Sequence, residues 1–167
     1  MIRLLVGTAA LFAVWAHEGM YCSAAHAQSS EHIVLEVKDA SADTTKTYEL
    51  ASLEALGLQM LATETPWTEG QVQFEGVLAR TVLADAGTSA TQIIATALND
   101  YQVLIPVSDF ENYDVILATR MNGQPMSVRD RGPIWVIYPW TSEPMLRDEV
   151  FFARSIWQLR SIQEQSD

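Results

Sequence analysis

Aromatic side chains and carboxylates share several turn segments of this sequence. Four aromatic residues lie in or beside turns: Trp67, Tyr101, Tyr138 and Trp140. A ring in such a place can stack on a flat heterocycle, and a nearby carboxylate can accept hydrogen bonds from an adjacent N–H pair. The carboxylates in these segments are Glu69, Asp100, Asp109 and Asp130. The same residue types also serve structural roles, since rings pack at strand ends and Asp caps turns.

A second candidate for chemistry is the charged loop from Ser127 to Pro133. Its Arg129 and Arg131 can hold a phosphate or a ligand hydroxyl, because guanidinium groups donate several hydrogen bonds. The alternative is that both are solvated or pair with the acidic residues of the chain. The sequence has no Gly-rich phosphate loop and no His or carboxylate spacing typical of a metal site.

The first 27 residues have the pattern of a secretory signal. Arg3 precedes an apolar run from Leu4 to Trp15, and Ala25-His26-Ala27 offers a small-x-small cleavage site. The run is short for a transmembrane helix. We therefore predict cleavage before Gln28 and a periplasmic or external location, with an uncleaved anchor as the alternative. A lipoprotein at Cys22 is disfavoured by the bulky Met20-Tyr21 before it.

Cleavage would change the chemistry available to the chain. Residues 28–167 keep one His, His32, and no Cys. A thiolate ligand or a Cys nucleophile is then excluded, and a Ser-His-Asp triad or a His-rich zinc site is disfavoured. Residues 28–167 are predicted to form a single domain that does not insert into the membrane.

Composition limits the partners. The chain has 167 residues, a formal net charge of −11, 49% hydrophobic and 19% charged residues, and a single Cys, which is typical of one globular domain without a disulfide framework. Its acidity disfavours nucleic acid and anionic lipid surfaces.

Hydrophobic patterning predicts an α+β fold with a mixed β-sheet of about seven short strands and few short helices. The expected strand segments are 32–37, 47–50, 58–65, 72–77, 91–98, 101–105, 115–121 and 134–138. Helical spacing occurs at 52–56, 78–86 and 108–112 and in the C-terminal tail around Val150. Ser52 is predicted to cap the first helix, and Asn99-Asp100 to form the turn of a hairpin.

Several segments together resemble the sulfite-oxidase-type molybdopterin-binding domain. They are Phe74–Leu78 followed by Gly87, Ala97–Tyr101, Ile116–Met126, Gly132–Pro139 and Trp157–Leu159. This resemblance implies that family's mixed-sheet fold over about residues 33–162. The family's enzymes bind molybdenum through a Cys, which the cleaved chain lacks, so we expect the fold without the redox centre.

Two segments are similar to a Cys-free subset of this fold, the PruR-type periplasmic pterin-binding proteins. These segments are Pro66–Gly70 and Gly132–Trp140. The resemblance implies a pterin ligand, no catalysis, and a partner in the periplasmic region of an inner-membrane cyclic-di-GMP enzyme. A pterin's exocyclic amine and ring N–H suit a carboxylate, and its polyol tail suits Asn99 or Ser108.

The candidate ligand-binding residues are therefore Trp67, Glu69, Asn99, Asp100, Tyr101, Asp109, Arg129, Asp130 and Tyr138, with no catalytic residue and no metal ligand. Two other functions stay open. One is a molybdopterin-dependent oxidoreductase with an unusual metal ligand, and the other is a protein-interaction domain that has lost the pocket.

Overall fold

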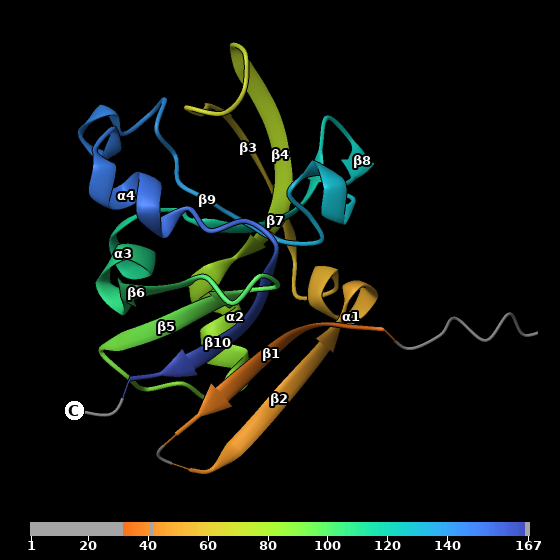
Figure 1. Ribbon diagram of the computed structural model, residues 1–167, viewed down its shortest axis with the longest axis vertical. Helices are drawn as coiled ribbons and strands as arrows, with labels where there is room; N and C mark the ends of the chain where they lie inside the picture. Colours follow the sequence, from red (N-terminus) through yellow and green to blue (C-terminus); the bar gives the residue numbers. More distant parts are fainter. Residues whose placement is uncertain (1–31, 41, 166–167) are drawn as a thin grey trace, which may run out of the picture.

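The computed structural model describes residues 32–40 and 42–165, and the proposed signal segment lies outside these residues. The described strands form two sheets, which Figure 1 shows one above the other. Among the described residues, no helix is long and apolar enough to cross a bilayer.

The first sheet joins the two ends of the described chain. Its N-terminal strand β1 pairs in parallel with the C-terminal strand β10, and the other pairings are antiparallel. The strand order is β2 (Thr44–Glu49), β1 (Ile33–Asp39), β10 (Leu159–Glu164), β5 (Gln92–Ala97) and β6 (Gln102–Pro106).

The second sheet is antiparallel and contains the long β3–β4 hairpin, which extends away from the first sheet in Figure 1. Its strands are β3 (Leu58–Glu64), β4 (Gln71–Leu78), β7 (Ile116–Met121) and β8 (Gln124–Pro125), and β9 (Trp135–Ile137) pairs with β7. β4 and β7 approach so closely that a Cβ on Gly76 would clash with the backbone of Leu117 and Ala118.

Short helices fill the ends and the space between the sheets. Helix α2 (Ala79–Ala86) contacts both β1 and β4, and ends at Gly87 in the left-handed conformation that glycine favours. The others are α1 (Leu50–Glu54), α3 (Val107–Asn112), α4 (Glu149–Arg154) and the 3-10 turns η1 (Val128–Asp130) and η2 (Pro144–Leu146). Helices α3 and α4 both contact β6 and lie on the same side of the molecule in Figure 1.

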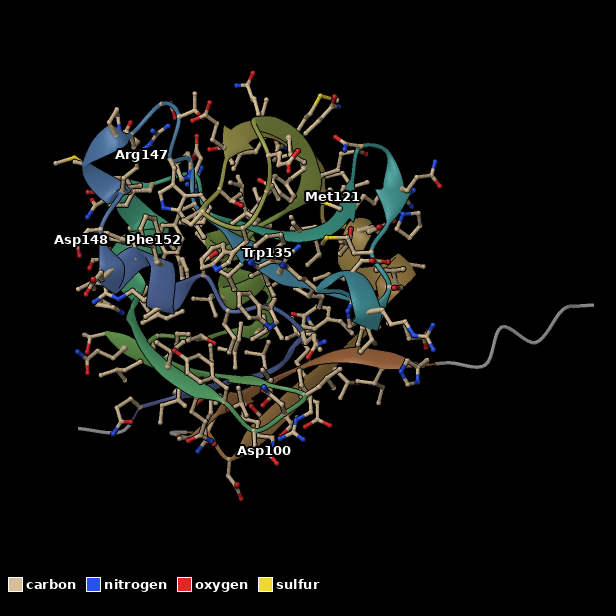
Figure 2. The ribbon with its side chains drawn as sticks, turned by 45° about the horizontal axis from the view of Figure 1, so that its top comes forward. Asp100, Met121, Trp135, Arg147, Asp148 and Phe152 are labelled. Carbon is tan, nitrogen blue, oxygen red and sulfur yellow. The ribbon has the colours of Figure 1, made fainter. Side chains whose placement is uncertain are left out.

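The core is aromatic as well as aliphatic. Trp135 lies near the centre of the molecule in Figure 2 and is fully buried, as are Phe74, Leu117 and Ile134. The edge of the Phe74 ring meets the Trp135 ring at a centroid distance of 5.5 Å. This packing fixes β9 and β4 against each other, and with them the loops that leave both strands.

The predicted α+β class is confirmed, and three local expectations are corrected. The described residues contain ten strands rather than about seven, and they divide into two sheets because β4 and β7 pair with each other instead of with the β1–β10 group. Ser52 is not the cap of α1 but its third residue, where its Oγ accepts a hydrogen bond from the Glu49 N–H.

Candidate functional site

The loop between β3 and β4 holds Trp67 in one orientation. The Trp67 N–H donates to Thr65 Oγ1 (3.1 Å), and its carbonyl oxygen accepts from Arg131 Nη2 (3.2 Å). Thr141 ties the end of β3 to the segment after β9, because its Oγ1 accepts from the Glu64 N–H and its own N–H donates to Thr63 Oγ1 (both 3.0 Å). The Trp67 backbone is thus anchored on both sides, which limits the positions that its ring can take and preorganises the loop for contact with a ligand.

Trp67 is the hub of an aromatic cluster. Its ring contacts four others, mostly edge to face. The centroid distances are 5.8 Å to Trp135, 6.2 Å to Trp140, 6.0 Å to Phe152 and 5.5 Å to Trp157. Trp67 nevertheless stays partly exposed, so part of its surface remains available for a ligand.

A cavity of about 340 Å³ lies against this cluster, which is within the usual range of small-molecule pockets of ~300–1,000 Å³. Most of its lining residues have either aromatic or small side chains. The lining residues are Trp67, Ala97, Asn99, Tyr101, Phe152, Ala153, Ser155, Ile156 and Trp157. The cavity thus combines flat apolar walls with a few polar groups, which suits a planar heterocycle.

Three segments distant in sequence meet at the cavity. The end of β5 and the turn after it supply Ala97, Asn99 and Tyr101, the β3–β4 loop supplies Trp67, and the chain from α4 to β10 supplies the rest. The Tyr101 hydroxyl donates to the Ala153 carbonyl (3.3 Å), and the Leu98 N–H donates to the Gln158 carbonyl (2.9 Å). These bonds hold the turn and the α4–β10 segment together across the cavity.

The polar groups in the cavity wall are neutral. Asn99 Oδ1 accepts from the Tyr101 N–H (3.2 Å), which fixes the carboxamide in the turn. Ser155 Oγ donates to the Val136 carbonyl, and the Ser155 carbonyl accepts from Trp135 Nε1 (3.1 Å). None of the lining side chains carries a charge. The carboxylate expected at a ring edge is therefore not among the lining side chains, and Asn99 is the lining residue with a side-chain amide.

Asp109 and Tyr138, both expected at the ligand, are not among the lining residues of the cavity and form a buried network with Arg154. Asp109 Oδ2 accepts from the Tyr138 hydroxyl and from Arg154 Nη1, both at 2.9 Å. Tyr138 is fully buried, and burial together with the negative Asp109 raises the pKa of its phenol well above the usual value of 10.0. The network fixes α4, since Arg154 is its last residue and follows Ala153 of the cavity wall.

The other predicted residues lie outside the cavity lining. Glu69 and Arg129 are exposed on their loops. Asp100 pairs with Arg160 at 3.1 Å with an 81% exposed side chain, and Figure 2 shows it at the rim of the molecule, far from Arg147. Asp130 accepts from Ser127 Oγ (2.7 Å) and so stabilises η1. Ser108, considered for a polyol tail, is exposed on α3.

Sequence reasoning missed the cavity residues of the α4–β10 segment. These are Phe152, Ala153, Ser155, Ile156 and Trp157. The sequence signal available was the placement of small residues between aromatic ones across the end of a short helix, a pattern that leaves space beside rings. The sequence indicated only a helical turn around Val150, followed by the Trp157–Leu159 segment of the family resemblance.

Comparison with known proteins identifies the family. The family model described as the oxidoreductase molybdopterin binding domain matches residues 26–143, which is most of the chain. The chain belongs to this family. The resemblance to the sulfite-oxidase-type domain is thereby confirmed. A search of curated proteins found no match. The family match ends before η2, α4 and β10, so one wall of the cavity comes from residues beyond it.

The cavity fits the pterin ring of a molybdopterin-type cofactor better than it fits the molybdenum. Its aromatic walls and Asn99 amide suit a pterin ring. For the metal, the described residues contain no group of three or more His, Cys, Asp or Glu side chains placed to bind an ion. The single Cys of the sequence, Cys22, lies outside the described residues. The residues at the cavity therefore supply no thiolate to a molybdenum centre.

Proposed function

We propose that this member of the molybdopterin-binding family is a periplasmic, non-catalytic pterin-binding protein. The observation that carries the proposal is the neutral, aromatic cavity of about 340 Å³ with the Asn99 amide in its wall. The absence of Cys from residues 23–167 supports a binding role over a molybdenum redox role. The similarity of Pro66–Gly70 and Gly132–Trp140 to the PruR-type proteins points the same way.

The contacts available in the cavity are consistent with reversible binding. Stacking of a flat ring on an aromatic side chain contributes about 1–3 kcal/mol, as measured for nucleic-acid bases. Each hydrogen bond from the Asn99 amide or a backbone group adds roughly 0.5–1.5 kcal/mol. After the costs of association, a few such contacts correspond to about micromolar affinity. That affinity suits a sensor that must release its ligand.

The ligand's effect on a partner is proposed to pass through the α4–β10 segment. This segment forms one cavity wall and is held to the core by the Asp109–Arg154 pair. We propose that the partner is the periplasmic region of an inner-membrane cyclic-di-GMP enzyme, as for the PruR-type proteins. The net charge of −11 favours a partner surface that is basic.

The ligand proposal is tested on protein purified from a pterin-producing host. Heat denaturation should release a pterin, which chromatography with fluorescence detection quantifies after mild iodine oxidation. We expect close to one pterin per protein, and mass spectrometry then gives its side chain. Protein that carries no pterin and binds none when 6-methylpterin or neopterin is added would overturn the proposal.

The signalling proposal needs a separate test in cells. Cyclic-di-GMP is measured in a strain that lacks this protein and is complemented with wild type or with Asn99→Ala. We expect the deletion to change the cyclic-di-GMP level and the variant to behave as the deletion does. Equal levels in all strains would remove the signalling role without affecting the ligand proposal.

The family match favours one alternative function, a molybdopterin-dependent oxidoreductase. In this case the chain would need a molybdenum ligand other than a thiolate from residues 23–167, or solvent oxygens alone. Elemental analysis of purified protein separates the two functions. Stoichiometric molybdenum would establish the oxidoreductase, whereas pterin without molybdenum would support the binding protein.

A further inference from the structure

A second cavity, of about 220 Å³, adjoins the first and differs from it in polarity. Its lining is Glu64, Thr65, Pro66, Trp140, Arg147 and Phe152. Phe152 lines both cavities, and Pro66 of this cavity directly precedes Trp67 of the other. A ligand in the first cavity therefore has the second one next to it, beside the Trp67 and Phe152 rings.

Trp140, which lines the second cavity, has a buried and unpaired hydrogen-bond donor. Its side chain is 1% exposed, and Nε1 has no hydrogen-bond partner among the residues that the structure describes. The other fully buried indole, that of Trp135, donates to the Ser155 carbonyl. A buried N–H without an acceptor costs about 1–3 kcal/mol. Because the Nε1 atom is itself buried, a ligand oxygen in the second cavity would remove that cost once the lining side chains move apart to expose the N–H.

The two charged side chains that line the second cavity, Arg147 and Glu64, have opposite signs, so the lining carries no net charge. Arg147 Nη2 pairs with Glu64 Oε2 at 3.1 Å, and Arg147 Nε donates to the Trp140 carbonyl oxygen (3.3 Å). A guanidinium has five donors, so Arg147 retains some for a ligand. The Glu64 carboxylate disfavours a phosphate dianion at the same place. The cavity thus favours a neutral group that carries oxygen atoms.

We propose that the second cavity binds the hydroxylated side chain of the ligand whose ring occupies the first. In this arrangement Trp140 Nε1–H donates to one side-chain oxygen and Arg147 to another. The inference rests on the proposed function and adds a selectivity: a free pterin with a neutral polyol chain binds better than the same ring with a phosphate on its chain.

Three probes separate the ring from its side chain: 6-methylpterin, neopterin and the phosphate ester of neopterin. Their Kd values are measured by fluorescence titration of ligand-free protein. We expect neopterin to bind about 10-fold more tightly than 6-methylpterin, which corresponds to 1.4 kcal/mol. The phosphate ester should bind no more tightly than neopterin.

Trp140→Phe removes the donor and keeps a ring in place. The affinity for neopterin should fall to that for 6-methylpterin, and the affinity for 6-methylpterin should stay unchanged. Arg147→Met is a second variant that spares the core, and it should reduce the neopterin advantage several-fold. Its matched control is Arg160→Met, because Arg160 is equally exposed (48% against 47%) and also pairs with a carboxylate at 3.1 Å.

The outcomes distinguish the two proposals. If none of the probes binds, the proposed function fails, and this inference fails with it. If the wild type binds 6-methylpterin as tightly as neopterin, the ring site stands and the side-chain site is wrong. Tighter binding of the phosphate ester than of neopterin, or an unchanged neopterin advantage in both Trp140→Phe and Arg147→Met, would also overturn the inference.

Discussion

At the scale of single residues, Asn99 is the polar group best placed to form hydrogen bonds with the edge of the proposed pterin ring. It lies in the cavity wall, and its Oδ1 is oriented by the Tyr101 N–H. A carboxamide presents a donor and an acceptor side by side, which matches the adjacent donor and acceptor positions of a pterin edge. The neighbouring Asp100 instead directs its carboxylate to Arg160.

Asn99→Ala is predicted to weaken pterin binding about 10-fold, which corresponds to the loss of roughly 1.4 kcal/mol of hydrogen bonding. Asp100→Asn should leave the Kd unchanged, because this side chain is 81% exposed and already paired. Fluorescence titration with neopterin measures both variants. The opposite pattern, with loss of binding only in Asp100→Asn, would show that a carboxylate and not the amide holds the ring.

Asp109→Asn is predicted to destabilise the protein by about 2–3 kcal/mol, somewhat less than the loss typical of fully buried pairs because Arg154 is 20% exposed. Urea unfolding at pH 7 measures the change, and Tyr138→Phe should cost only about 1 kcal/mol. An Asp109→Asn variant as stable as the wild type would mean that the network does not hold α4.

The Tyr138 phenol also gives a pH signature. Its pKa is raised in the folded state, so its contribution to stability is fully present below pH 10.0 and is lost as the pH rises above that value. Tyr138→Phe should therefore reduce the loss of stability on the alkaline side. Urea unfolding between pH 8 and pH 11 compares the two proteins, and identical alkaline slopes would contradict the role of this phenol.

Residue types alone separate cavity residues from core residues only in part. Trp67, Asn99 and Tyr101 were predicted because turns place such side chains near solvent, and the structure brings them together. Tyr138 and Asp109 follow the same local pattern but face inward. Their partner Arg154 comes from a helix 45 residues further along the chain than Asp109, and no local pattern reveals such a pairing.

At the scale of elements, the Glu54 carboxylate fastens α1 to β7. It accepts from Arg120 Nε and Nη2 at 3.0 and 2.8 Å and from Thr119 Oγ1 at 2.7 Å. The hydrogen bonds from Arg120 are the main cause that lowers the pKa of this carboxyl below its usual value of 4.5. The stability that they provide is therefore present above pH 4.5 and is lost as the pH falls through the lowered pKa.

Glu54→Gln should reduce the urea midpoint at pH 7 and make the midpoint less sensitive to pH below 4.5. Urea unfolding between pH 3 and pH 7 tests this expectation. Glu36→Gln is the control, because Glu36 pairs with Lys38 at 3.5 Å with both side chains well exposed, and such surface pairs contribute little. A Glu54→Gln variant with the wild-type acid slope would contradict the prediction.

The elements themselves were more predictable than their pairing. The β5–β6 hairpin follows from two apolar runs around Asn99-Asp100, and Asp100 indeed has the positive φ (64°) that such turns tolerate in Asp. The parallel pairing of β1 with β10 joins the two ends of the described chain. Local periodicity says nothing about a contact of that sequence separation, so the division into two sheets was not predicted.

At the scale of the whole molecule, Cys22 decides between the two functions. The predicted cleavage before Gln28 would remove this residue, and with it the single thiol of the chain. A pterin-binding protein loses nothing by this removal. A molybdenum enzyme that bound its metal through Cys22 would lose its ligand.

Protein expressed with its leader in a Gram-negative host should therefore begin at Gln28, show no reactive thiol and contain no stoichiometric molybdenum. Intact mass spectrometry, thiol titration and elemental analysis measure these three properties on one preparation. Cys22→Ser should be processed in the same way and should carry the same amount of pterin. Retention of Cys22 together with molybdenum that disappears in Cys22→Ser would instead identify a thiolate-bound metal centre, and would replace the sensor by an oxidoreductase.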